Sequence, residues 1–226
     1  MPAKSLLIAG TDTGVGKTIL TAAIASYYQR YYPEQKVAVY KPIQSGTGDR
    51  EYYQRVLNLS QSQDEITPIF LSAPLAPPIA AEKQNQQIDL GFIWHKYQQL
   101  VTEYDLVLVE TLGGLGSPIT YEYLVADLAR DWQIPTVLVG VVRLGGIAQI
   151  VANVALGRSL HIPIKGIVLN CISPESRESL ADLTPPALIE NLTNVPVWGI
   201  LPHISDIYST QQLSQSAQAL DRLLPE

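Results

Sequence analysis

The chain has 226 residues, of which 46% are hydrophobic and 16% charged, and its formal net charge at pH 7 is −6. This composition favours a folded, enzyme-like chain, and the acidic balance argues against nucleic acid as a general partner, because phosphate binding needs a surplus of Lys and Arg on one face. No stretch reaches the 18 or so apolar residues of a membrane span, and the N-terminal apolar run is too short for a signal peptide, so we expect a cytoplasmic protein. We expect the single cysteine, Cys171, to be a buried apolar residue in a reducing compartment.

Segments typical of strands and helices alternate along the chain. In chain order the patterns predict a strand at 5–10, a helix at 17–32, a strand at 36–41, a helix at 50–59, an irregular proline-rich surface segment at 68–84, a helix at 89–103, a strand at 105–110, a helix at 120–132, a strand at 135–142, a helix at 145–160, a strand at 164–172, a helical stretch, a strand at 195–202 and a helix at 207–223.

Several of these strands are apolar on both faces, which is typical of a parallel sheet covered by helices. The alternation of strands and helices then predicts a three-layer α/β/α fold with a mostly parallel sheet. Since no linker or repeat interrupts the pattern, we expect one domain over residues 1–226. Ligands of such sheets bind at the carboxyl ends of the strands, so the residues that follow strands are the informative ones.

A glycine-rich loop, GTDTGVGKT, follows the first predicted strand and precedes the first helix. The phosphate-binding pattern is glycine, four residues, then Gly-Lys-Ser/Thr, and here Thr11 stands at the first position, where a small residue suffices. Gly14 and Gly16 let backbone N–H groups turn toward an anion at the helix N-terminus. Lys17 can reach the β- and γ-phosphates, and Thr18 can offer its hydroxyl to Mg²⁺. The loop therefore predicts a P-loop NTPase-like fold that binds a nucleotide.

Two later strand ends carry residues that could complete such a site. The second strand runs into YKPIQSG, where Lys41 could approach the nucleotide from the side, and Asp49 follows shortly and could bind Mg²⁺. Glu110 closes the apolar strand DLVLVE before a glycine-rich turn, which is typical of a Walker B acid that binds Mg²⁺ directly or through water.

With these residues in place, the chain resembles the dethiobiotin synthetase family, the ATP-dependent carboxylases of biotin synthesis. The resemblance spans essentially the whole chain and rests on GTDTGVGKT, YKPIQSG, VLVETLGG, VADLARDWQIPTVLV, VVRLGGIAQ, GIVLN and GILP in family order. The specific parts are Thr11-Asp12-Thr13 within the loop and the Lys-Pro…Ser-Gly segment.

The resemblance implies a role for each matching position. Lys41 and Lys17 would be catalytic, with Lys41 near the γ-phosphate and the substrate carbamate. Nucleotide would be bound by Asp12, Thr13, Gly14, Val15, Gly16, Lys17, Thr18, Ile19, Asp49, Glu110, Asn170 and Pro202, the last two at the base. Mg²⁺ would be held by Thr18, Asp49 and Glu110. The diamine end of the substrate would be bound by Thr11 and Ser45. Its carboxylate would be bound by Leu144, Gly145, Gly146 and Ile147 of the neighbouring subunit in a homodimer. These four residues start a helix, and a helix N-terminus favours an anion.

The implied reaction joins CO₂ (or bicarbonate) to 7,8-diaminononanoate with MgATP and yields dethiobiotin, ADP and phosphate. One amine captures CO₂ as a carbamate, whose oxygen attacks the γ-phosphate and forms a carbamic–phosphoric anhydride. The second amine then closes the cyclic urea and releases phosphate. Such chemistry needs positioning and charge stabilisation and no protein nucleophile.

The chain departs from the family pattern at two places. Thr111-Leu112 replaces Gly-Ala after the Walker B acid, where a bulkier turn could alter nucleotide contacts, and a preference between ATP and CTP stays open. Around the carboxylate segment, Arg143, Gly146, Ala148 and Gln149 replace the usual Lys, Cys, Asn and His, which leaves the side-chain contacts there open.

Two rival functions have different signatures. A dimeric P-loop ATPase of the partition type, which positions a protein partner, carries a signature lysine where this chain has Asp12. The synthetase domain of a corrinoid amidotransferase has a similar P-loop, but it belongs to much longer chains with a cysteine-based glutaminase domain. Both are weaker matches than the carboxylase.

Overall fold

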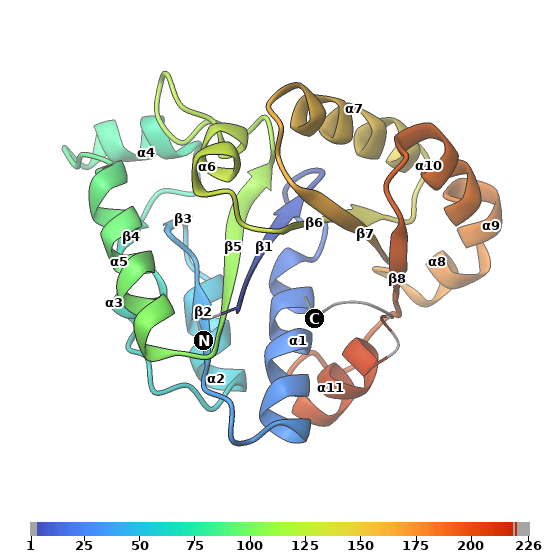
Figure 1. The fold of residues 1–226 in the computed structure, drawn as a ribbon, viewed down its shortest axis with the longest axis horizontal. Coiled ribbons are helices and arrows are strands. Elements are labelled where there is room, and N and C mark those ends of the chain that lie inside the picture. Colours follow the sequence, from blue (N-terminus) through green and yellow to red (C-terminus); the bar gives the residue numbers. More distant parts are fainter. Residues whose placement is uncertain (1–3, 219, 221–226) are drawn as a thin grey trace.

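A parallel sheet of six strands lies at the centre of the computed structural model, which describes residues 4–218 and 220 (Figure 1). Every neighbouring pair in this sheet is parallel, as the apolar strand patterns predict. In sheet order the strands are β2 (Val37–Tyr40), β5 (Leu106–Gly114), β1 (Lys4–Gly10), β6 (Thr136–Val141), β7 (Ile164–Asn170) and β8 (Val197–Leu201).

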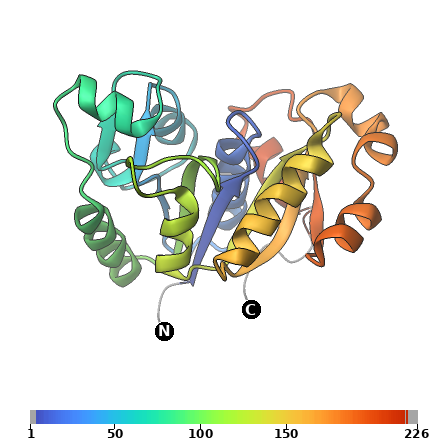
Figure 2. The same cartoon turned by 90° about the horizontal axis from the view of Figure 1, so that it is seen from above.

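Helices cover both faces of the sheet, so the three-layer prediction is confirmed. One face packs against α1 (Lys17–Tyr31), α2 (Asp49–Val56), α3 (Gln63–Ile66) and α11 (Thr210–Gln218). The other packs against α5 (Leu90–Glu103), α6 (Val125–Trp132), α7 (Gly146–Ser159) and α10 (Pro186–Thr193). Figure 2 shows the sheet between α7 on one side and α1 on the other.

Each strand of the sheet serves both cores because successive side chains point to opposite faces. In β1, Leu7 and Ala9 belong to one buried cluster, and Leu6 and Ile8 to the other. All four side chains are almost fully buried, with exposed fractions of 1% or less. The sheet therefore holds its strand ends in fixed register, and those ends carry the residues singled out from the sequence.

The proline-rich segment 68–84 differs from its predicted irregular conformation. It contains β4 (Ile69–Leu71), which pairs in parallel with β3 (Ile43–Ser45), and then α4 (Pro77–Lys83). Prolines at the start of α4 are compatible with a helix because the first N–H groups of a helix have no intrahelical partner. Strand β4 therefore pairs with the part of the YKPIQSG segment that forms β3.

Two further helices, α8 (Pro174–Glu178) and α9 (Leu180–Leu183), precede α10 in the stretch predicted only as helical. Strand β5 continues to Gly114, beyond its predicted end at residue 110. Cys171 is buried, as predicted from the composition. The predicted last helix falls partly outside the described residues, at 219 and 221–223.

No helix within residues 4–218 has both the length and the apolar character needed to span a membrane.

Helix α2 begins at Asp49 because the side chain of Glu51 caps its first turn. The backbone N–H of Gly48 donates to Glu51 Oε2 at 2.8 Å, and Arg50 Nε donates to Oε1 at 2.9 Å. Burial would raise the pKa of Glu51, but these bonds outweigh it and lower the pKa to about 2. The ionised carboxylate is therefore part of what fixes the position of Asp49.

Replacing Glu51 by Gln should destabilise the protein at neutral pH and remove a pH dependence. Because the pKa of Glu51 is lowered on folding, its contribution is complete above about pH 4.5 and is lost as pH falls toward about 2. The side chain is 36% exposed, so after screening we expect a loss of about 1 kcal/mol at pH 7. Urea unfolding of both proteins at pH 7 and pH 3 tests this: the difference should be clearly smaller at pH 3, and an equal difference at both pH values contradicts it.

Candidate active site

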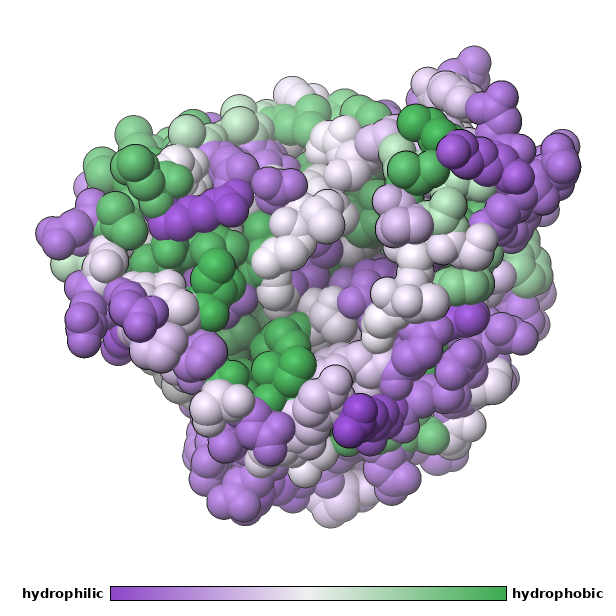
Figure 3. Space-filling view, turned by 180° about the vertical axis from the view of Figure 1, so that it is seen from behind, coloured by the Kyte–Doolittle hydropathy of each residue, from purple (hydrophilic) through white to green (hydrophobic). Residues whose placement is uncertain are grey.

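A pocket of about 830 Å³ opens at the carboxyl ends of β1, β2 and β5. These strands are neighbours in the order β2-β5-β1, so the residues that follow them meet at one edge of the sheet. This edge lies on the face seen in Figure 3, which is hollowed near its centre. The lining residues are Thr13, Gly14, Gly16, Lys17, Thr18, Ile19, Lys41, Gln44, Ser45, Asp49, Pro74, Leu75, Ala76, Pro77, Glu110, Leu112, Gly113, Ser117 and Pro118.

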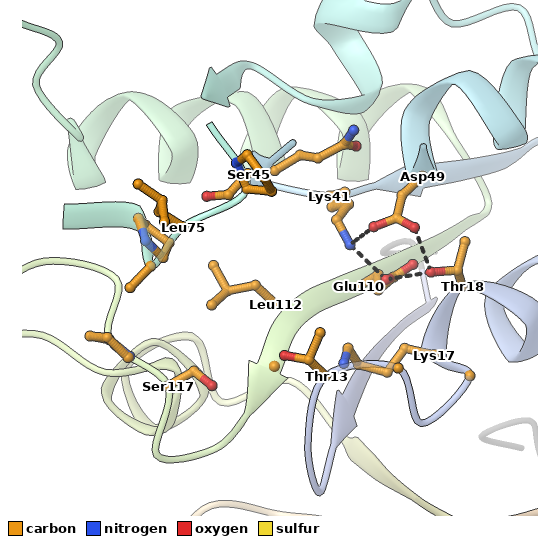
Figure 4. A pocket seen from close by; sticks show the side chains of 18 of the residues that line it. Thr13, Lys17, Thr18, Lys41, Ser45, Asp49, Leu75, Glu110, Leu112 and Ser117 are labelled. Carbon is orange, nitrogen blue, oxygen red and sulfur yellow. Dashed lines mark hydrogen bonds and ion pairs between the residues drawn. The ribbon is translucent and has the colours of Figure 1, made fainter. Parts of the chain in front are cut away.

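Lys41 forms the centre of a charged cluster in this pocket (Figure 4). Its Nζ lies 2.7 Å from Glu110 Oε1 and 2.6 Å from Asp49 Oδ2. The Thr18 hydroxyl lies 3.0 Å from Asp49 Oδ1 and 3.0 Å from Glu110 Oε1. The end of β2, the start of α1, the start of α2 and β5 thus each contribute one side chain to a single cluster.

Burial sets the electrostatics of this cluster. Lys41 is 4% exposed and Glu110 is 1% exposed. Burial alone would lower the pKa of Lys41, but the carboxylates of Glu110 and Asp49 outweigh it and raise that pKa, so Lys41 stays protonated. Burial works against ionisation of Asp49 too, yet the Lys41 ammonium lowers the pKa of Asp49. For Glu110, burial is the dominant effect and raises the pKa.

Lys17 lies against the loop that it belongs to. Its Nζ donates to the backbone carbonyl of Asp12 at 3.0 Å. Burial lowers the pKa of Lys17 to about 8, and the nearby charge of Lys41 adds to this effect. Lys17 therefore holds its proton less firmly than Lys41, and an anion bound beside it would strengthen its hold.

The phosphate loop has the backbone conformation for which its glycines were singled out. Gly14 and Gly16 have φ values of 74° and 95°, in the region that favours glycine. A Cβ at Gly16 would collide with the side-chain amide of Asn170. That amide donates to the carbonyl of Val15 at 2.8 Å, so Asn170, at the end of β7, holds the backbone of the phosphate loop in place.

The residues expected at the nucleotide base are close to the loop but outside the lining of the pocket. Asn170 is bound to Val15 as described, and it pairs in register with Leu201, directly before Pro202. Pro202 is half-buried. Asp12 and Val15 also lie outside the lining, whereas Thr13, Gly14, Gly16 and Ile19 belong to it.

The residues expected to bind substrate fall into two groups. Ser45 lines the pocket, whereas Thr11, in the phosphate loop, lies outside the lining. The hydroxyls of both residues are buried and have no hydrogen-bond partner in the described chain. Buried hydroxyls of this kind are available to a ligand. The second group, 144–147, lies outside the pocket lining at the start of α7, where Leu144 is 87% exposed.

The positions that depart from the family pattern have definite contacts. Thr111 is buried and its hydroxyl donates to the carbonyl of Ile8 at 3.3 Å, whereas Leu112 projects into the pocket between Leu75 and Thr13 (Figure 4). Gln149 Nε2 lies 3.3 Å and Arg143 Nη2 3.4 Å from Asp12 Oδ2. These two contacts tie the beginning of α7 to the phosphate loop.

Thr18, Asp49 and Glu110 form a donor set that fits Mg²⁺. All of their donors are oxygens, which Mg²⁺ prefers, and it commonly takes one or two carboxylates together with phosphate oxygens and water. Within the described residues, no group of three or more His, Cys, Asp and Glu side chains is arranged to hold a metal. A cation at this cluster would therefore depend on the hydroxyl and on a phosphate ligand as well.

Sequence reasoning missed several residues of the pocket. Gln44, Pro74–Pro77 and Ser117 line it, and the hydroxyl of Tyr53, on α2, donates to Glu110 Oε2. No local motif marks Tyr53, whose ring is fully buried. The predicted helix 50–59 contains Tyr53 but not Asp49, whereas the observed helix begins at Asp49 and so places the two residues, four apart, on the same face.

Comparison with known proteins gives a consistent set of relatives. A family model described as an AAA domain matches residues 4–211. The ATP-dependent dethiobiotin synthetase BioD of Gloeothece citriformis is 47% identical, over 98% of this chain and 99% of that protein. The protein of the same name from Crocosphaera subtropica is 46% identical, over 96% of this chain and 97% of that protein. The one from a Synechocystis strain is 42% identical, over 97% of this chain and 92% of that protein.

Solved structures with a similar fold are far more distant in sequence. A ParA family ATPase from Chlorobium tepidum is 15% identical, with a TM-score of 0.63 over 96% of each chain. The MinD cell division protein of Aquifex aeolicus is 18% identical, with a TM-score of 0.59 over 96% of this chain and 93% of its own. At such identity the likeness concerns the fold alone, and it agrees with the P-loop NTPase-like architecture.

Replacing Gly16 by Ala should damage the phosphate loop more than replacing Gly14. Both positions have positive φ, but only at Gly16 does the added Cβ also meet the Asn170 amide; at Gly14 it meets nothing within 4 Å. We expect Gly16→Ala to lower the free energy of unfolding by about 3 kcal/mol and to abolish ATP binding, and Gly14→Ala to cost about 1 kcal/mol. Denaturant unfolding and calorimetry with ATP measure both effects, and equal losses for the two variants would contradict this role of Asn170.

Proposed function

The chain belongs to the family of ATP-dependent dethiobiotin synthetases, and from that membership we propose that it makes dethiobiotin in biotin biosynthesis. The substrates are 7,8-diaminononanoate, CO₂ (or bicarbonate) and ATP, and the products are dethiobiotin, ADP and phosphate. Family membership rests on relatives that are 41–47% identical over nearly their whole length. We further propose that residues 1–226 act as one domain, in a cytoplasmic homodimer.

The observation that carries this proposal is the Lys41 cluster beside the phosphate loop. A buried ammonium held by two carboxylates stays charged, and it faces the pocket into which Lys17 and the loop also project. Two positive side chains on either side of a transferred phosphoryl group supply the positioning and charge stabilisation that phosphoryl transfer needs.

The pocket has large apolar side chains beyond the charged cluster. Figure 4 shows Leu75 and Leu112 facing each other across the space beyond the charged cluster, with Ser117 nearby, and Pro74 and Pro118 also belong to the pocket lining. A substrate with amines at one end and a chain of methylene groups fits this division, since the amines meet polar groups and the chain meets apolar ones. We assign the amine end to the hydroxyls of Thr11 and Ser45, and their lack of a hydrogen-bond partner in the described chain supports this assignment.

The proposed mechanism uses these residues for positioning. One substrate amine takes up CO₂ and forms a carbamate, and Lys41 holds the carbamate oxygen in line with the γ-phosphate. As the carbamate oxygen bonds to the γ-phosphorus, the bond from that phosphorus to the β–γ bridging oxygen breaks and ADP leaves, while Lys17 and the backbone N–H groups of the loop stabilise the negative charge on the phosphoryl oxygens. The second amine then attacks the carbonyl carbon of the anhydride, a C–N bond forms, and phosphate leaves.

Mg²⁺, when bound, would neutralise part of the charge on the β- and γ-phosphates. Thr18, Asp49 and Glu110 would hold it, directly or through water. Asn170 and Pro202 are proposed to lie at the nucleotide base, and residues 144–147 at the substrate carboxylate of a neighbouring subunit. The exposed start of α7, with Leu144 projecting into solvent, supports this last assignment.

The rival function, a partition-type ATPase that positions a protein partner, has only the fold in its favour. Asp12 stands where those proteins carry their signature lysine, and its carboxylate contacts Arg143 and Gln149 of the same chain. The carboxylase is therefore the better-supported function.

ATP consumption by the purified protein should depend on the diamine. We expect phosphate release with 7,8-diaminononanoate, bicarbonate and Mg²⁺ together, and less than a tenth of that rate when the diamine is omitted, because no acceptor then faces the γ-phosphate. Coupled detection of phosphate, with mass spectrometry of the organic product, measures this. Equal hydrolysis with and without the diamine would rule out the carboxylase.

Replacing Lys41 by Ala should lower kcat at least about 100-fold while ATP still binds, because Lys41 acts on the transferred group and the loop remains intact. The control is Lys36→Ala, which removes an exposed lysine at the other end of the same strand. Steady-state kinetics and ATP calorimetry, on variants shown by thermal unfolding to be folded, separate the two effects. A folded Lys41→Ala enzyme with normal kcat would remove Lys41 from the mechanism.

A further inference from the structure

Tyr53 is a buried polar residue that neither the sequence motifs nor the proposed mechanism uses. Its side chain is 0% exposed and packs in the core between α1, α2 and the sheet. A phenylalanine would fill almost the same space without burying a hydroxyl, which costs free energy unless the hydroxyl is hydrogen-bonded. The hydroxyl therefore needs an explanation beyond packing.

The hydroxyl of Tyr53 donates to Oε2 of Glu110. The other oxygen, Oε1, accepts from Lys41 at 2.7 Å and lies 3.0 Å from the Thr18 hydroxyl. The terminal torsion of a glutamate side chain is soft, so partners on one oxygen alone would leave the plane of the carboxylate free to turn. With donors on both oxygens, the orientation of Glu110 is fixed.

The position of Tyr53 on α2 explains how this donor reaches the site. Asp49 and Tyr53 are four residues apart, so they lie on the same face of the helix, one turn from each other. Asp49 contacts Lys41 and Thr18, and Tyr53 contacts Glu110. One helix face thus supports both carboxylates of the cluster.

We propose that Tyr53 is a positioning residue for phosphoryl transfer: its hydroxyl holds Glu110 Oε2 so that Oε1 faces Thr18, Lys41 and the phosphate loop. This rests on the proposed function, in which Glu110 acts on the magnesium–nucleotide complex. Groups that orient metal-binding carboxylates in this way commonly change metal affinity or activity by roughly 10- to 100-fold when they are removed.

The test compares Tyr53→Phe with Tyr40→Phe. Tyr40 is equally buried, and its hydroxyl donates to the carbonyl of Ile93 at 2.6 Å, but its ring packs on the opposite face of the sheet. Each variant therefore loses one buried tyrosine hydrogen bond, and only one of those bonds involves Glu110. Thermal unfolding establishes that the two variants are folded and shows how much stability each has lost.

Two readouts separate positioning from packing. Calorimetry of ADP binding over a Mg²⁺ series measures the site without turnover, and steady-state kinetics with diamine and bicarbonate give kcat, KM and the half-saturating Mg²⁺ concentration. We expect Tyr53→Phe to raise that concentration roughly tenfold in both assays and to lower kcat roughly 10- to 100-fold. Tyr40→Phe should leave both within twofold of the wild type.

The proposal is overturned if Tyr53→Phe keeps kcat and Mg²⁺ dependence within twofold of the wild type, or if Tyr40→Phe changes them equally. If Tyr53→Phe does not fold, Tyr53→Met, which also lacks the hydroxyl but can repack, carries the same expectations. Failure of both to fold assigns the hydroxyl to stability alone and overturns the proposal. Wild-type hydrolysis that ignores the diamine would overturn the proposed function instead, and Mg²⁺-dependent ADP binding would still decide the role of Tyr53.

Discussion

The structure of the site depends on one buried ion-pair cluster, in which the ammonium of Lys41 lies between Glu110 and Asp49. A buried charged group is stable only when its charge is paired and its hydrogen bonds are made, so the buried side chains of Lys41 and Glu110 stabilise each other, and the half-buried Asp49 gives Lys41 a second partner. This requirement links the end of β2, the strand β5 and the start of α2, which are otherwise distant in the sequence. It also keeps Lys41 protonated at a position where a positive charge can act on a phosphoryl group.

The helix α2 is the element that makes this cluster rigid. Glu51 caps its first turn, Asp49 enters the cluster as its first residue, and Tyr53 supports Glu110 one turn later. The helix itself has few apolar residues, and its place is fixed by Tyr53 and Val56 in the core. A short polar helix thereby joins the stability of the fold to the geometry of the site.

The structural neighbours show which fold the chain has, and the relatives show which family it belongs to. The neighbours, at 15–18% identity, share the fold, which is a scaffold used for many functions. The dethiobiotin synthetases are similar in sequence over nearly the whole chain, at 41–47% identity. In this chain Asp12 contacts Arg143 and Gln149, so the phosphate loop is tied to the beginning of α7.

The sequence alone determined the parallel three-layer fold and the main polar residues of the site. Apolar runs, glycine-rich turns and residues that end strands are local patterns, and the strand ends of a parallel sheet meet at one edge, so these patterns suffice to group Lys17, Thr18, Lys41, Asp49 and Glu110. Only the tertiary structure decided which atoms meet: the strand pair β3–β4 within a proline-rich segment, the bond from Asn170 to the phosphate loop, the link from Asp12 to α7, and the hydroxyl of Tyr53 on Glu110. Each of these depends on strand order, register or helix rotation, which are set by the packing of the whole core and leave no signal in the neighbouring residues of the chain.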